Sequence, residues 1–128
     1  MRYRMFRIGK TFTFDAAHKL PDHDGKCRHL HGHTYKVEVV LVGEHLHLSG
    51  PQQGMLLDFD VVKKVWSKIE PEFDHQFLNE SLQLKNPTAE ELARVLYDSF
   101  VVATQVGVKL ESVTVWETPT SWASYVRS

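Results

Sequence analysis

Alternating apolar and polar residues predict the strands of this chain. Between Phe6 and Phe14 every second residue except Lys10 is apolar, and the alternation resumes from His33 to Val42. A period of two residues is typical of half-buried strands. Two further segments rich in β-forming residues, Leu110 to Trp116 and Trp122 to Val126, lie on either side of a Thr-Pro-Thr turn, and we predict strands there too.

A helical period follows the second strand. The short apolar run Met55 to Leu57 is a candidate short strand. After it, Asp58 or Asp60 can cap a helix, because the apolar residues from Val61 to Ile69 follow i, i+3, i+4 spacing. This first helix is expected to end near Pro71.

The second helix has the stronger start signal. Thr88 and Glu91 form a capping box, and the apolar face that follows extends to Phe100. We expect this helix to stop near Gly107. The predicted fold is α+β in a single domain of residues 1–128, with two helices on one face of an antiparallel sheet whose edges pair between subunits.

Composition and charge narrow the class of protein. Hydrophobic residues at 42% and charged residues at 24% are ordinary for a globular domain. Fifteen basic and sixteen acidic residues nearly balance, without a basic cluster, so we expect no nucleic-acid partner. No apolar run suits a membrane span or a signal peptide. The single cysteine, Cys27, cannot form an internal disulfide, so a reducing cytoplasm is the expected location.

Three histidines form a candidate metal site. His31 and His33 are two residues apart in an extended segment, so their imidazoles project to the same face, and Gly32 lets another group approach. Antiparallel pairing can bring His18 beside them. Three imidazoles with an open fourth position are typical of catalytic zinc, although iron or nickel would also accept them. Alone, the His-x-His pair could be an exposed strand end.

Cys27 has three interpretations: a fourth zinc ligand, a free thiolate beside the metal, or a small buried core residue. It lies between Lys26 and Arg28 in a polar loop, where positive charge favours the thiolate. By composition alone, four more histidines could replace the proposed ligands. We expect them to be exposed, because none has a partner at a preorganised spacing: His23, His29, His45 and His47.

The segment from Cys27 to His33, with His18 upstream, resembles the Cys-x-x-x-His-Gly-His signature of the family of 6-pyruvoyltetrahydropterin and 6-carboxytetrahydropterin synthases. An ordered set of further matches, which covers nearly the whole chain, makes the resemblance highly specific. These matches are Phe14-Asp15-Ala16-Ala17-His18, Asp58-Phe59, Asp74-His75-x-x-Leu78-Asn79, Asn86-Pro87-Thr88 and Glu117-Thr118.

The resemblance implies an assembly and a metal site. The implied tunnelling fold has a four-stranded antiparallel sheet with two helices on one face, and its subunits join edge to edge into trimeric barrels that stack as a homohexamer. Active sites are then at subunit interfaces. By the same resemblance, His18, His31 and His33 bind zinc, and Cys27 is the general base.

Four other residues receive roles from the resemblance. Asp74 and His75 form a relay in which the carboxylate orients the imidazole and favours its protonated form. Glu117 accepts two parallel hydrogen bonds from the N–H edge of a pterin ring. Thr88 belongs to the substrate site, although its main role is that of a helix cap. The alternatives are hydrogen bonds at a helix–loop junction for Asp74 and His75, and a surface ion pair for Glu117.

Two branches of the family act on 7,8-dihydroneopterin triphosphate. One eliminates triphosphate and keeps the side chain, giving 6-pyruvoyltetrahydropterin for tetrahydrobiopterin synthesis. The other cleaves the side chain, releasing acetaldehyde and leaving 6-carboxy-5,6,7,8-tetrahydropterin for queuosine-type nucleosides. The compact loop from Pro21 to Lys26 and the close run from Asp74 to Asn79 look more like the carboxy branch, so we predict a lyase of that kind. A non-catalytic zinc module closed by Cys27 and an inactive pterin-binding relative are the alternatives from other classes.

Overall fold

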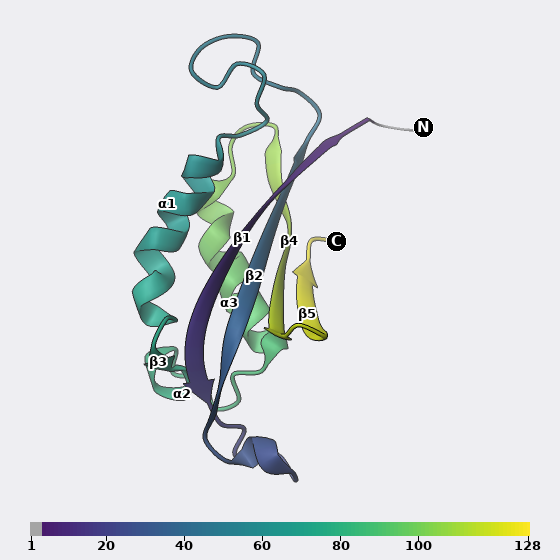
Figure 1. The fold of residues 1–128 in the computed structure, drawn as a ribbon. Coiled ribbons are helices and arrows are strands. Elements are labelled where there is room, and N and C mark those ends of the chain that lie inside the picture. The colour runs from purple at the N-terminus through teal and green to yellow at the C-terminus, as the bar shows by residue number, and fades with distance from the viewer. Residues whose placement is uncertain (1–3) are drawn as a thin grey trace.

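The computed structural model describes residues 4–128, in which five strands form one sheet (Figure 1). The sheet order is β3-β1-β2-β4-β5. Its four long strands pair antiparallel, and the two-residue β3 pairs in parallel with β1 at Ala16 and Ala17. The strands are β1 (Phe6–His18), β2 (His31–Gly43), β3 (Gln76–Phe77), β4 (Val108–Thr118) and β5 (Ser121–Val126).

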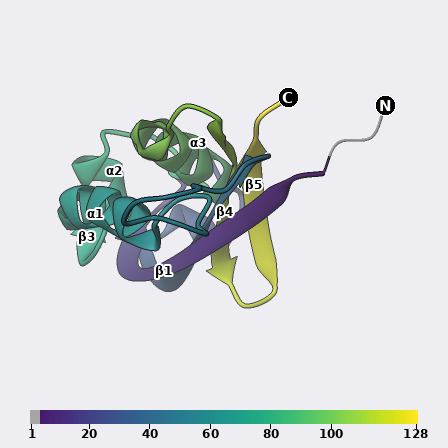
Figure 2. The same cartoon turned by 90° about the horizontal axis from the view of Figure 1, so that it is seen from above.

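Two main helices, α1 (Phe59–Ile69) and α3 (Ala89–Phe100), cover one face of the sheet, and a single turn, α2 (Leu78–Ser81), follows β3 (Figures 1 and 2). Both main helices start at the predicted caps. The carboxylate of Asp58 accepts a hydrogen bond from the backbone N–H of Asp60 (2.9 Å), and Thr88 Oγ1 accepts one from the N–H of Glu91 (3.2 Å). No helix within residues 4–128 is long and apolar enough to cross a membrane.

The hydrophobic core lies between the helices and the sheet. From Tyr35 to Leu41, every second residue of β2 is buried in this core, as a half-buried strand requires. Phe14 of β1 stacks on Tyr35 of β2 with 4.8 Å between ring centroids. The apolar faces of the two helices supply the opposite wall, chiefly through Val62, Trp66, Leu92, Leu96 and Phe100.

The predicted α+β class and the antiparallel sheet with two helices on one face are confirmed, with three local corrections. Met55 to Leu57 is not a strand: Leu56 and Leu57 are buried in the core while Met55 remains exposed. The extra strand is β3 instead. The second helix ends at Phe100, before Gly107, because a 3-10 turn (Val101–Ala103) follows it.

Candidate metal centre

The three histidines meet where β1 ends and β2 begins. His18 and His31 are cross-strand partners in the antiparallel register, and His33 lies two residues further along the same face of β2. One ligand nitrogen from each ring lies within 4.8 Å of the other two. His18 is almost completely buried, at 1% exposure, whereas His31 and His33 are partly exposed.

Backbone carbonyls fix the orientation of two of these rings. His18 Nδ1 lies 2.8 Å from the carbonyl oxygen of Pro87, and His31 Nδ1 lies 2.7 Å from that of His29. Because a carbonyl oxygen only accepts hydrogen bonds, each Nδ1 carries the hydrogen, and Nε2 of the neutral ring keeps its lone pair. The two Nε2 atoms face one another at 3.0 Å.

This arrangement fits a bound cation. Two lone pairs at such a distance repel one another unless a positive charge lies between them. In the described part of the chain, the buried Nε2 of His33 has no hydrogen-bond partner. Burial lowers the pKa of both His18 and His33, which favours the neutral rings that metals need. Two imidazoles on one tetrahedral zinc place their nitrogens about 3.4 Å apart. The donor set and spacing therefore suit a metal ion that prefers imidazole.

Cys27 lies in a 3-10 turn (Lys26–Arg28) of the loop between β1 and β2. Its carbonyl accepts a hydrogen bond from the N–H of Leu20 (2.7 Å), which closes the loop at its base. The side chain is partly exposed, and its sulfur is not within the group of ligand atoms that the histidines form. Both features favour a free thiol over a fourth ligand or a core residue.

Asp74 and His75 form a pair at the sheet edge next to β1. His75 Nδ1 lies 2.8 Å from Asp74 Oδ2, while Asp74 Oδ1 accepts a hydrogen bond from the N–H of Asp15 (3.0 Å). The hydrogen bonds from Asp15 and His75 hold the pKa of Asp74 below its usual range, and Asp74 raises the pKa of His75. The φ angle of 59° at His75 is in the left-handed region, and its N–H donates to the Asp15 carbonyl (2.6 Å).

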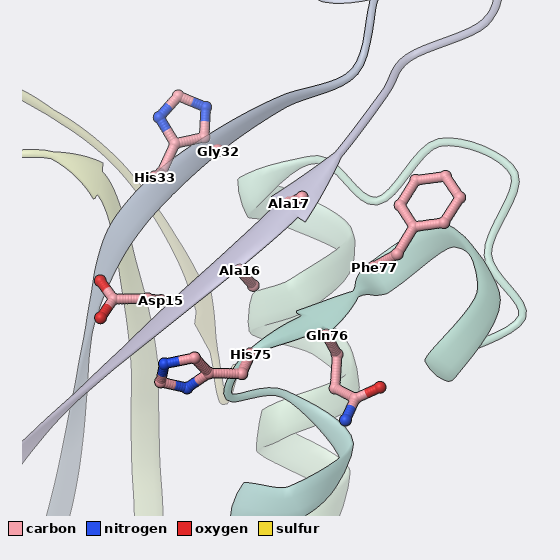
Figure 3. A pocket seen from close by; sticks show the side chains of 8 residues that line it. All are labelled: Asp15, Ala16, Ala17, Gly32, His33, His75, Gln76 and Phe77. Carbon is pink, nitrogen blue, oxygen red and sulfur yellow. The ribbon is translucent and has the colours of Figure 1, made fainter.

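An open pocket of about 510 Å³ lies between this pair and the histidine cluster. Figure 3 shows His33 and His75 on opposite sides of β1, with the carboxylate of Asp15 beside the His75 ring. Three of the residues that line the pocket are small: Ala16, Ala17 and Gly32. The pocket is therefore a surface on which a flat molecule could contact both groups.

The two residues predicted to bind substrate lie on different elements, Glu117 in β4 and Thr88 at the start of α3. Glu117, near the end of β4, places Oε1 3.6 Å from Nε2 of His33, so its carboxylate borders the histidine cluster. Thr88 caps α3 with its hydroxyl, which confirms the cap.

Of the loop histidines, His23, His29 and His45 are exposed and His47 is partly buried, and none belongs to the cluster.

Sequence reasoning did not assign three groups that the structure places at the site. Asp15 joins Asp74 and His75 in a cluster of ligand-type atoms, and Asn79 contacts the residue after His18. Both residues belong to segments that attracted attention as motifs, which was the available signal. Pro87 also belongs to such a segment, Asn86-Pro87-Thr88, but its contribution is a backbone carbonyl, and residue type does not reveal the role of a backbone atom.

Comparison with known proteins gives consistent matches. The profile of the family described as 6-pyruvoyl tetrahydropterin synthase matches residues 7–128. The 6-carboxy-5,6,7,8-tetrahydropterin synthase of Synechocystis sp. is 42% identical over 94% of this chain and 93% of that protein. The enzyme of the same name from Haemophilus influenzae is 38% identical over 94% and 99%. The solved 6-pyruvoyl tetrahydropterin synthase of Caenorhabditis elegans has a TM-score of 0.80 at 27% identity, over 100% of this chain and 99% of that one.

Proposed function

Because the chain belongs to the 6-pyruvoyl tetrahydropterin synthase family, we propose that it is a zinc-dependent lyase that forms 6-carboxy-5,6,7,8-tetrahydropterin. The substrate is 7,8-dihydroneopterin triphosphate, which with one water gives the carboxypterin, acetaldehyde and triphosphate, for 7-deazaguanine (queuosine) biosynthesis. The tunnelling fold expected from the sequence is shown for the single chain by its match to solved relatives. The names of the relatives from Synechocystis and Haemophilus support the carboxy branch.

The observation that carries the proposal is the cluster of three imidazoles. The lone pairs of His18 and His31 converge, and the buried Nε2 of His33 has no hydrogen-bond partner among residues 4–128. A zinc ion bound there supplies Lewis acidity, which lowers the pKa of hydroxyl groups on the substrate side chain. Because the ring nitrogens that bind the metal cannot also accept a proton, the proton transfers fall to other residues.

Cys27 and the Asp74–His75 pair are the groups proposed to move protons. Cys27 is the general base that removes a proton from substrate carbon. Asp74 raises the pKa of His75, which favours the protonated ring, and this proton can be returned on the other side of the pocket. Cys27 is partly exposed and the His75 side chain is largely exposed, so both are accessible to substrate.

Glu117 is proposed to recognise the pterin ring through paired hydrogen bonds to its N–H edge. Its position beside His33 supports this role, because a ring held there would extend its side chain toward the histidine cluster. Thr88 contributes mainly by fixing the start of α3, next to the Pro87 carbonyl that orients His18.

The proposed assembly is a homohexamer, a dimer of trimers, with active sites at subunit interfaces. The two sheet edges support it. β5 ends the sheet on one side with exposed Trp122 and Val126, and on the other side β3 covers only a short part of β1. Exposed edges of this length are commonly closed by pairing with another chain.

The decisive experiment incubates zinc-loaded protein with 7,8-dihydroneopterin triphosphate, identifies the pterin by mass and measures acetaldehyde. A carboxypterin with matching acetaldehyde is the expected result. A pyruvoyl product without acetaldehyde would assign the second candidate, 6-pyruvoyltetrahydropterin synthase, which the likeness to the Caenorhabditis elegans structure favours. The absence of any turnover would reject both catalytic assignments and return the pterin-binding and zinc-module alternatives.

A further inference from the structure

Asn79 in α2 bonds to two chain segments that surround the histidine cluster. Its Oδ1 accepts a hydrogen bond from the N–H of Lys19 (3.0 Å), and its Nδ2 donates to the carbonyl of the same residue (2.8 Å). Nδ2 also donates to the carbonyl of Lys85 (3.0 Å). One side-chain amide thus joins the end of β1 to the segment that precedes α3.

Both segments determine where the His18 ring lies. Lys19 directly follows His18, the last residue of β1. The two hydrogen bonds from Asn79 to the N–H and carbonyl of Lys19 therefore fix the backbone one residue after the histidine. Lys85 lies two residues before Pro87, whose carbonyl accepts from His18 Nδ1. Asn79 therefore holds both the backbone next to His18 and the segment that bears its hydrogen-bond acceptor.

The turn that carries Asn79 is itself well anchored. Leu78 is fully buried in the hydrophobic core, and the adjacent Phe77 pairs with β1. The amide is therefore presented from a fixed position, as a residue that orients another must be.

We propose that Asn79 is a positioning residue for His18, which keeps Nδ1 of that ring on the Pro87 carbonyl and directs Nε2 toward His31 and His33. This inference rests on the proposed metal site and adds a residue that sets its geometry. Partners of this kind, which orient a metal-binding histidine, typically change metal affinity by about 10- to 100-fold.

Two variants of Asn79 remove its hydrogen bonds in different ways. Asn79→Asp keeps the size and the acceptor for the Lys19 N–H, but it loses both donors and turns a carboxylate toward two carbonyl oxygens. Asn79→Ala removes all three bonds. Tyr97→Phe is the matched control, because it removes one side-chain hydrogen bond to a backbone carbonyl, that of Leu110, near the other end of α3.

The first readout is NMR of metal-free protein labelled with ¹⁵N-histidine. In the native protein and in Tyr97→Phe, we expect His18 as a single tautomer with a slowly exchanging Nδ1–H. In both Asn79 variants that signal should be lost or split into two tautomers. The second readout is Co²⁺ titration, in which both Asn79 variants should bind at least about tenfold more weakly than the native protein.

Several results would overturn the inference: an Nδ1–H of His18 that persists in the Asn79 variants, Co²⁺ affinity within twofold of native, or unfolding of both variants while Tyr97→Phe stays folded. The last result would make Asn79 a residue of the fold alone. Because the NMR readout needs neither metal nor substrate, a native protein without turnover would reject the proposed reaction and leave this test decisive.

Discussion

Cys27 and the three histidines are close in sequence, but the structure gives them different surroundings. The three imidazoles bring their ligand nitrogens within 4.8 Å of one another, whereas the Cys27 sulfur is not part of this group. We therefore predict that Cys27→Ala retains its zinc and loses turnover by several orders of magnitude. Metal analysis and product formation on the same sample test this. Loss of zinc together with turnover would instead show that Cys27 is a ligand. Cys27→Ser, in which a hydroxyl of similar size is a poorer base than the thiol, should likewise retain zinc.

The Asp74–His75 pair predicts a pH dependence with a definite sign. Asp74 raises the pKa of His75, so Asp74→Asn should lower the pKa measured from the His75 ring proton by NMR. The stabilisation linked to His75 is lost as pH rises through its raised pKa. That linked to Asp74 is lost as pH falls through its lowered pKa.

Asp74→Asn should therefore cost the most stability between about pH 4 and pH 6.5, the ordinary pKa values of the two groups. Urea unfolding across this range tests the window. An unchanged pKa of His75 would show that Asp74 does not control its protonation.

At the residue scale, sequence reasoning was most informative where the chain itself preorganises the chemistry. His31 and His33 share a face because of strand geometry, and the pairing of β1 with β2 was enough to expect His18 beside them. The groups that orient them depend on contacts across long sequence separations. Asp15, Asn79 and the Pro87 carbonyl meet the site only after the sheet and α3 have packed, so local spacing could not assign their roles.

At the element scale, Thr88 provides a test of the cap on α3. Its hydroxyl satisfies one of the N–H groups that every helix start leaves unpaired. Thr88→Ala should reduce the free energy of unfolding by about 1 kcal/mol, and Thr88→Ser should restore most of it. Chemical denaturation of the three proteins measures both. Equal losses in the two variants would contradict a cap through the hydroxyl.

Long periodic segments were predictable as elements, and short ones were not. The four long strands and both main helices follow from apolar periods and caps, and β1 ends at His18, as expected for a histidine at the end of that strand. β3 has only two residues, Gln76 and Phe77, which cannot display a period. The apolar run at Met55 to Leu57 has the composition of a strand. Its two leucines are apolar because they are buried in the core, and they do not pair with a strand.

At the scale of the whole molecule, the open edge of β1 can be located from the hydrogen bonds of Asp15. Its N–H donates to Asp74 and its carbonyl accepts from His75, so both backbone groups point away from β2. The register between β1 and β2 has no shift, and backbone direction alternates along a strand. The backbone N–H and carbonyl groups of Thr13 and Thr11 therefore also point away from β2. Neither residue is among the two residues of β1 that pair with β3.

This geometry allows the proposed assembly to be tested without breaking the chain's own sheet. Thr11→Pro removes one outward N–H, and proline is tolerated at edge strands on the side that makes no bond within the chain. We expect the native protein to sediment as six chains and Thr11→Pro to dissociate into smaller species, while near-UV circular dichroism shows that it stays folded. Thr11→Ala, which keeps the N–H, should remain hexameric.

Dissociation should also abolish turnover in Thr11→Pro, although no proposed site residue has been changed. The reason is that active sites at subunit interfaces need groups from two chains, so a folded single chain lacks part of each site. Sedimentation and product formation, measured on the same samples over a range of concentrations, should decline together. A dissociated variant with native turnover would place the complete site within one chain, and a hexameric variant would move the interface away from this edge of β1.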